Sequence, residues 1–137
     1  MQTLCPLCGS HLIHEARPRE IIYRNHKVSI SQMAEYCDGC GEAFLSHADS
    51  KSTEKVIADF KRTVDHLLTS DEIKEIRRKH KITQKQAANI FGGGINAFSK
   101  YERGEAIQNK STDLILRMLA NNIVNMETLM KVSQNQV

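Results

Sequence analysis

Four cysteines in two C-x2-C pairs constrain this chain more than any other feature of its sequence. Cys5 and Cys8 form the first pair, Cys37 and Cys40 form the second, and a glycine follows each second cysteine. A C-x2-C turn directs two thiolates to one point, and the glycine lets the backbone turn tightly around them. Two such turns supply the four soft ligands of tetrahedral zinc. The sequence therefore predicts one structural Zn²⁺ ion held by all four cysteines.

Other roles for the cysteines fit the sequence less well. The 28 residues between Cys8 and Cys37 exceed the commonest finger spacing, but a β-hairpin can bring the two pairs together. Redox chemistry needs a thiol of low pKa, usually at a helix N-terminus, and nothing here indicates that setting. Unligated buried thiols are the remaining alternative. Four protein ligands leave no open coordination position, so the site is expected to be structural rather than catalytic. The six histidines are scattered, and we expect them at the surface.

Composition places the chain among soluble globular proteins. It has 137 residues, of which 40% are hydrophobic and 26% charged, enough for one ordinary domain or two small ones. No apolar run approaches the ~20 residues that span a bilayer, and the first ten residues do not resemble a signal peptide. We therefore expect a cytoplasmic location, where thiols stay reduced and paired cysteines favour metal over a disulfide.

The first half predicts a hairpin followed by a helix. Residues 19–30 are rich in β-branched and aromatic residues around a polar turn at 24–27. Residues 49–68 follow a helical period. The apolar stripe of this helix consists of Val56, Ile57, Phe60, Val64, Leu67 and Leu68. Its opposite, solvated side holds Lys55, Asp59, Arg62 and Asp65. A break at Thr69-Ser70 suggests a domain boundary, with a zinc-binding domain over 1–68 and a second domain over 69–137.

The second half predicts about five short helices. Ser70 is expected to cap the first, and residues 83–86 form a capping box for the second, which ends at Phe91. Three glycines at 92–94 form a turn, a third helix covers 95–102, and Gly104 closes it. Two further helices are expected over 111–121 and 125–133. The predicted fold class is α+β: a small zinc-ribbon-like domain with a hairpin and a helix, joined to an all-α domain.

Residues 83–104 carry the pattern of a helix-turn-helix, TQKQAANIFGGGINAFSKYERG. Asn96 and Lys100 lie four residues apart and so share the outer face of the second helix. An Asn can bind adenine bidentately, and a Lys can donate to guanine. We also place Ile95 and Ser99 on the DNA-binding side. Gln84 and Lys85 begin the first helix, where backbone N–H groups favour a phosphate.

Positive charge is concentrated beside this motif. Residues 1–68 carry eight basic and nine acidic side chains, whereas residues 69–137 carry eleven and seven. The basic run beside the motif consists of Lys74, Arg77, Arg78, Lys79, Lys81 and Lys85. A basic run is usually a solvated helix face, but its place next to a base-reading motif favours phosphate contacts, which we assign to Lys79 and Lys81. Residues 101–104 are interpreted as a packing Tyr, an internal ion pair and a C-cap.

The last two predicted helices are unusually apolar. They carry Leu114, Ile115, Leu116, Met118, Leu119, Ile123, Val124, Met126, Leu129, Met130 and Val132. So small a domain cannot easily bury this much apolar surface on one stripe. We therefore predict a homodimer formed through the second half, with two helix-turn-helix motifs about one DNA turn apart.

The motif resembles the Xre/Cro family of helix-turn-helix repressors. From end to end the chain resembles the MqsA-type antitoxins, the YgiT-type zinc-finger family of bacterial toxin–antitoxin modules, through CPLCG, YCDGCGE and GGGINAFSKYE. The resemblance implies a zinc domain that grips an mRNA-cleaving, MqsR-like toxin, and a dimeric domain that represses its own operon at a palindromic operator. The base-reading Asn of the family corresponds to Asn96, and its base-reading Arg corresponds to position 100, which here is Lys.

Three other functions deserve comparison. A stand-alone Xre-type repressor with a structural zinc site is the closest alternative, and the neighbouring gene distinguishes it, because an antitoxin is transcribed together with its toxin. A zinc-ribbon RNA-binding or ribosome-associated factor predicts a basic zinc domain, yet residues 1–68 are net acidic. An enzyme is the least supported, since we find no nucleophile–base pair, open metal site or phosphate-binding glycine motif.

Overall fold

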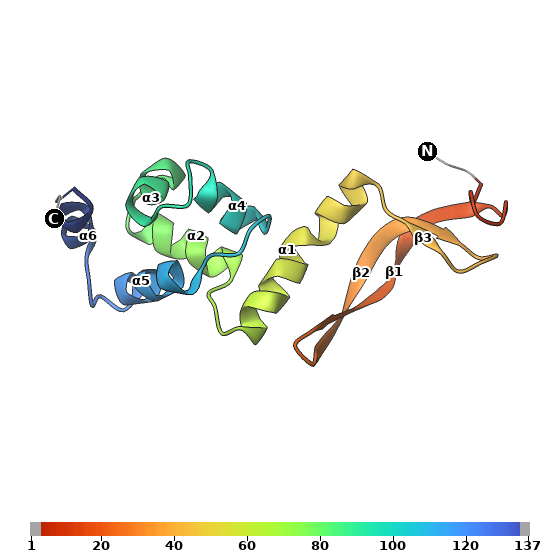
Figure 1. Ribbon diagram of the computed structural model, residues 1–137, viewed down its shortest axis with the longest axis horizontal. Helices are drawn as coiled ribbons and strands as arrows, with labels where there is room; N and C mark the ends of the chain where they lie inside the picture. The colour runs from red at the N-terminus through yellow and green to blue at the C-terminus, as the bar shows by residue number, and fades with distance from the viewer. Residues whose placement is uncertain (1–3, 135–137) are drawn as a thin grey trace. The chain divides into compact units, whose positions relative to one another are not determined.

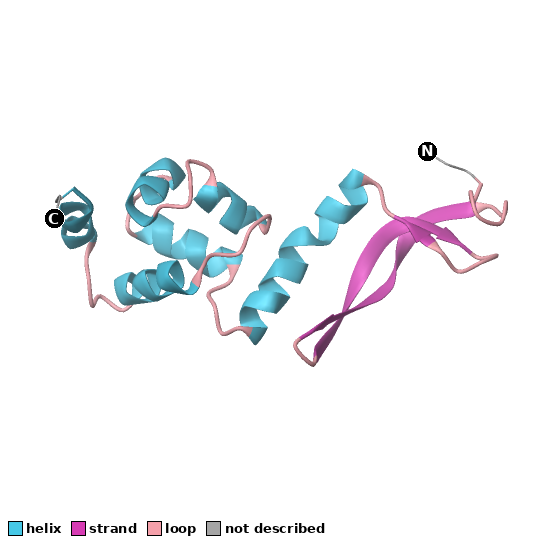
Figure 2. Cartoon of the chain, in the orientation of Figure 1, coloured by secondary structure: helices cyan, strands magenta, loops and turns pink. Residues whose placement is uncertain are grey.

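The computed structural model describes residues 4–134 and confirms the α+β class. Within that range it contains three β-strands and six α-helices (Figure 2). The chain divides into two compact units, Met1–Ile57 and Ala58–Val137. This division falls inside a helix, earlier than the break predicted after residue 68. Among the described helices, none has the length and apolar character needed to cross a membrane.

The first unit is built on a long β-hairpin. Strand β1 (Leu12–Tyr23) pairs antiparallel with β2 (His26–Cys37), and the two-residue strand β3 (Ala43–Phe44) extends the sheet in the order β1-β2-β3 (Figure 1). Arg24 and Asn25 form the turn with φ of 47° and 65°. Two left-handed residues match the twist of the flanking strands, as in a type I′ turn. The hairpin is therefore longer than the predicted 19–30 and has a tighter turn.

Helix α1 (His47–Val64) begins with a reciprocal cap. The backbone N–H of Asp49 donates to Ser46 Oγ, and that of Ser46 donates to Asp49 Oδ2, each over 3.1 Å. From β1, His14 Nε2 donates to the other oxygen of Asp49 over 2.9 Å. Gln32 of β2 donates to the Asp49 carbonyl over 3.0 Å. Polar contacts therefore fix the start of α1 to the hairpin.

The predicted apolar stripe of α1 is partly wrong. The side chain of Val56 is 49% exposed, whereas Arg62, assigned to the solvated side, is completely buried. Helical periodicity predicts where a helix lies, but it assigns the buried face only from the apolar residues. A buried cation such as Arg62 is therefore assigned to the solvated face. Five of the six histidines are exposed, as predicted, although His14 also contacts Asp49. His80 is half-buried, and its Nε2 atom is buried without a hydrogen-bond partner.

The second unit contains the five predicted short helices. They are α2 (Ser70–Lys79), α3 (Gln84–Phe91), α4 (Ala97–Arg103), α5 (Lys110–Ala120) and α6 (Met126–Gln134). Thr69, not Ser70, caps α2, because its side chain and Glu72 satisfy each other's backbone N–H groups. The capping box of Thr83 and Gln86 is confirmed. Gly104, with φ 81°, closes α4.

An aliphatic core holds α2 to α5 together, with a small aromatic cluster at its centre. The core consists of Leu68, Ile73, Ile76, Ile82, Ala87, Ala97, Phe98, Tyr101, Leu116 and Leu119. The ring of Phe98 lies 5.3 Å from each of the rings of Phe91 and Tyr101. The buried Ala87 lets α3 approach α4 closely. The core thereby fixes the helix-turn-helix on a rigid base.

Candidate metal centre and nucleic-acid interface

The two cysteine turns have the same backbone geometry. The N–H of Gly9 donates to the carbonyl of Cys5, and the N–H of Gly41 donates to that of Cys37, both over 2.9 Å. The two glycines have φ of 78° and 80°, a left-handed conformation that disfavours any side chain. Both C-x2-C-G segments therefore fold into one kind of knuckle, as their sequences predict.

The knuckles bring the four thiols together. The Sγ atoms of Cys5, Cys8, Cys37 and Cys40 all lie within 4.8 Å of one another. Sγ of Cys5 is 3.7 Å from that of Cys40, and Sγ of Cys8 is 3.3 Å from that of Cys37. Tetrahedral Zn²⁺ with Zn–S bonds of about 2.3 Å separates its sulfurs by about 3.8 Å. The donor set and its spacing fit one closed metal site.

Ser10 and Gly39 support the site, and the sequence analysis missed both. Hydrogen bonds from the side chain and backbone of Ser10 lower the pKa of Cys8 to about 6. A Cβ at Gly39 would collide with Ser10 Oγ and lie 3.1 Å from Cys8 Sγ. Glycine at this position therefore leaves room for the sulfur and for its hydrogen-bond donor. The glycine at C-x-G-C was visible in the sequence, but only the packing shows why it is required.

Helix α4 exposes the residues predicted to contact base edges. Asn96 is the N-cap of α4, and its side chain makes no capping hydrogen bond. Asn96, Lys100 and Ile95 are exposed, and Ser99 is half-buried. The helix begins at Ala97 rather than at the predicted Ile95, because Ile95 and Asn96 form a turn in which the N–H of Ala97 donates to the carbonyl of Gly94 over 3.1 Å. The amide of Asn96 is therefore not engaged by its own helix.

The residues predicted to contact phosphate lie around the start of α3. Gln84 and Lys85 occupy its first turn, with Gln84 half-buried and Lys85 exposed. Lys79 ends α2, and Lys81 lies in the following turn with φ 56°. Both of these lysines are exposed. Four candidate phosphate contacts therefore border one helix N-terminus.

Arg77 does not belong with these cations, although it lies in the same basic run. Its guanidinium binds both carboxylate oxygens of Glu102, over 2.8 and 2.9 Å. It also donates to the carbonyl of Ile82 over 3.0 Å. Glu102 is almost fully buried, so this bidentate pair holds α2 against α4. Arg77 is therefore a structural residue. The ion pair predicted within residues 101–104 is wrong, because Glu102 pairs with Arg77 and Arg103 pairs with Glu105.

Comparison with known proteins decides the family. A family model described as the antitoxin component of the bacterial toxin–antitoxin system, MqsA, matches residues 3–127. The chain belongs to the MqsA antitoxin family. Antitoxin MqsA of Escherichia coli (strain K12) is 32% identical to it over 118 residues, which cover 84% of this chain and 90% of that protein. The MqsA-type resemblance seen in the sequence is thus confirmed, and membership of this family implies a regulatory role.

The family match covers both parts of the site. Residues 3–127 include the four clustered cysteines as well as the whole helix-turn-helix. This MqsA-family antitoxin therefore joins a unit whose four cysteines could hold a metal ion to a helical unit that carries a helix-turn-helix.

Proposed function

We propose that this MqsA-family antitoxin neutralises an mRNA-cleaving, MqsR-like toxin through its zinc-binding part, residues 1–68. Through residues 69–137 it dimerises, binds a palindromic operator and represses its own operon. The observation that carries the proposal is the exposed pair Asn96 and Lys100 on α4, in a chain whose other end gathers four cysteines. The family match supports the toxin as partner.

The proposed DNA contacts are of two kinds, to base edges and to phosphates. Asn96 and Lys100 meet base edges in the major groove, where an amide can bind adenine N6 and N7 and an ammonium can donate to guanine O6 and N7. Lys79, Lys81 and Lys85 meet phosphates, which gives affinity for any sequence. Exposure of all five side chains supports this division.

Zn²⁺ is the metal that suits the cysteine cluster. Four thiolates in a closed set are the ligands of structural zinc sites, and they leave no position for a substrate or water. When bound, the ion contributes folding energy to the N-terminal unit. The chain's own part is to hold Cys5 and Cys37 buried, beside the hairpin, through the two knuckles.

A second copy of the chain covers the apolar surface of α5 and α6. In the described residues, α6 has no buried side chain. Exposed apolar side chains on and between these helices are Leu114, Met118, Ile123, Met130 and Val132. A two-fold axis through this surface would bury it and place two α4 helices on the half-sites of a palindrome.

Binding of full-length protein to DNA from upstream of its own gene tests the repressor function. Fluorescence anisotropy is measured on this duplex and on a scrambled one over several salt concentrations. Asn96→Ala should cost about 1–3 kcal/mol per half-site on the operator and little on scrambled DNA. Lys81→Ala should weaken both alike and reduce the salt slope by about one unit per contact. Equal losses on both duplexes for Asn96→Ala would contradict the proposed recognition face.

The partners are tested separately. Co-expression with the product of the neighbouring gene should yield a stable complex and suppress its cleavage of mRNA. If that product is not a ribonuclease, or does not bind, the stand-alone repressor becomes the better description.

Light scattering of the full chain should show a dimer, and a clean monomer at high micromolar concentration would contradict the dimeric operator complex.

A further inference from the structure

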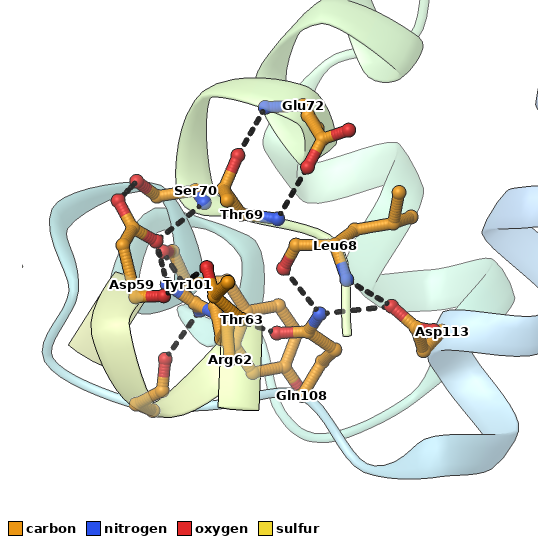
Figure 3. Close-up of polar contacts among 11 residues, drawn as sticks. Asp59, Arg62, Thr63, Leu68, Thr69, Ser70, Glu72, Tyr101, Gln108 and Asp113 are labelled. Atoms are coloured by element: carbon orange, nitrogen blue, oxygen red, sulfur yellow. Dashed lines mark hydrogen bonds and ion pairs between the residues drawn. The ribbon is translucent and has the colours of Figure 1, made fainter. Parts of the chain in front are cut away.

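The second half of α1 places a charged side chain inside the helical unit. Arg62 is completely buried. A guanidinium taken out of water is tolerated only where hydrogen bonds and opposite charge compensate it. Its Nη1 donates to Asp59 Oδ1 over 3.0 Å, and its Nε donates to Gln108 Oε1 over 2.9 Å (Figure 3). Because the buried charge is tolerated only with these partners in place, it restricts the positions that Asp59 and Gln108 can take.

The remaining contacts of Arg62 reach the end of the recognition helix. Its Nη2 donates to the carbonyl of Tyr101 in α4 over 3.1 Å, and to the carbonyl of Ala106 over 2.9 Å. Carbonyls in the last turn of a helix lack partners within it and carry its negative dipole end. A guanidinium at this point therefore caps α4 and fixes the loop that follows.

The same loop is bonded to a residue of the DNA-contacting face. The N–H of Glu105 donates to the carbonyl of Lys100 over 2.9 Å, and the N–H of Ala106 approaches it at 3.4 Å. Arg62 thus binds the carbonyl of Ala106, in the same short segment whose N–H groups donate to the carbonyl of Lys100. At the other end of α4, Asn96 is the N-cap and follows three glycines. A helix of seven residues depends on such tertiary contacts for its position.

Neighbouring elements hold the partners of Arg62 in place. Gln108 Nε2 donates to the carbonyl of Leu68 over 2.9 Å and to Asp113 Oδ1 over 3.0 Å. Asp59 accepts from the N–H and the hydroxyl of Ser70, at the start of α2, over 2.8 and 2.6 Å. Figure 3 shows Gln108 bonded to Leu68 and Asp113, and Asp59 bonded to Ser70. The network therefore ties α4 to α1, α2 and α5.

We propose that Arg62 is a positioning residue for operator recognition. It sets the end of α4 so that Asn96 and Lys100 meet the base edges together. The proposal rests on the DNA-binding function proposed above. It assigns to a residue outside the helix-turn-helix a part in sequence discrimination, in addition to its part in stability.

A double-mutant cycle between Arg62 and Asn96 tests the proposal. The measured quantity is the ratio of operator to scrambled-DNA affinity for full-length protein, at low temperature and with the folded fraction determined by circular dichroism. Arg62→Met should lower this ratio about tenfold per half-site, the loss expected for one misplaced bidentate base contact. Binding to scrambled DNA should stay within about twofold, since phosphate contacts tolerate a shifted helix. In the Asn96→Ala background, Arg62→Met should lower the ratio much less.

Two further variants separate positioning from stability. Leu119→Ala removes a fully buried side chain from the same core without touching the α4 carbonyls, and it should leave the ratio unchanged in folded protein. Arg62→Lys keeps the charge, but one ammonium cannot hold Gln108 and both carbonyls. Its ratio should fall between those of the wild type and Arg62→Met, and it decides the question if Arg62→Met does not fold.

The outcomes are distinguishable. A wild-type ratio in Arg62→Lys, or equal losses on both duplexes for Arg62→Met, would overturn the positioning role. If Asn96→Ala alone leaves the ratio unchanged, the proposed recognition face itself is wrong. If Asn96→Ala lowers the ratio and the Arg62 variants do not, only the inference about Arg62 fails.

Discussion

Lysine at position 100 bears directly on the operator recognition proposed for α4. The MqsA-type resemblance implies arginine there, and arginine presents a planar fork that matches guanine O6 and N7, whereas lysine presents a single rotatable ammonium. Because Lys100 is exposed on α4, a longer head group meets no obstacle in the free protein.

Lys100→Arg is therefore expected to tighten operator binding, or to sharpen its preference at a single base pair. The gain should be about 1 kcal/mol per half-site if position 100 faces a guanine. Anisotropy titrations against duplexes substituted at each base pair in turn would locate the effect. A uniform gain on every duplex would indicate a phosphate contact instead.

The glycine turn before α4 offers a matched pair of substitutions. Gly93 and Gly94 have similar φ, 92° and 96°. A Cβ at Gly93 would lie 3.2 Å from Ala97 Cβ and 3.2 Å from the hydroxyl of Tyr101, whereas one at Gly94 has nothing within 4 Å. Gly94→Ala should cost about 1–2 kcal/mol from backbone strain alone, and Gly93→Ala about 1 kcal/mol more from crowding. Urea unfolding of both variants checks the order, and equal losses would rule out the crowding.

Single residues also show where sequence reasoning reaches its limit. The four cysteines and the capping box at Thr83 were found because their spacing is local and chemically specific. The role of Arg62 was not found, because its partners Tyr101 and Gln108 lie far along the chain. Periodicity assigns a charged residue to solvent unless a distant carboxylate and carbonyls are known to surround it.

At the scale of the elements, the contact that fixes α1 to the hairpin depends on the charge of the Asp49 carboxylate, and so on pH. Hydrogen bonds from His14 and from the backbone of Ser46 hold the pKa of Asp49 below its usual range. A carboxyl whose folded pKa is lowered stabilises the folded state above its ordinary pKa, and this stabilisation is lost as the pH falls through the lowered value.

Asp49→Asn should therefore reduce stability at neutral pH, and the difference from wild type should shrink in strongly acidic solution. Urea unfolding across this pH range, monitored in the first unit, would show the convergence. Glu75→Gln, at an exposed position of α2, is the control and should give no such trend. A constant difference at all pH values would mean that the Asp49 charge contributes nothing.

The hairpin shows what can and cannot be predicted for an element. Its existence follows from β-branched residues around 24–27, but the strands continue to Leu12 and Cys37, well beyond the predicted ends. Polar residues such as Arg17 and Gln32 lie within the strands and interrupt the alternation that marks strand length. Gln32 is buried by contacts with Thr53 and Asp49, which a local pattern does not reveal.

For the whole molecule, the metal should stabilise one unit and leave the other intact. Cys37→Ser removes a buried ligand and should release the metal and unfold the hairpin unit, while the helical core, which contains no cysteine, stays folded. Metal analysis with circular dichroism and operator binding would check this. Ser31→Ala, exposed on the same strand, is the control. Reduced wild-type protein that binds no zinc would contradict the assignment of the ion.

The pairing of Leu12 with Cys37 has a consequence for how the sheet is selected during folding. Slipping the hairpin by one residue turns every side chain of β2 to the opposite face, so the Cys37 sulfur would point away from the first knuckle. Only chains in the correct register can then gather all four sulfurs. Because a ligand stabilises the state that it binds, bound metal would favour the hairpin register that brings the four sulfurs together. If the four cysteines bind metal as proposed, a larger metal supply should raise the fraction of chains whose hairpin is in the correct register.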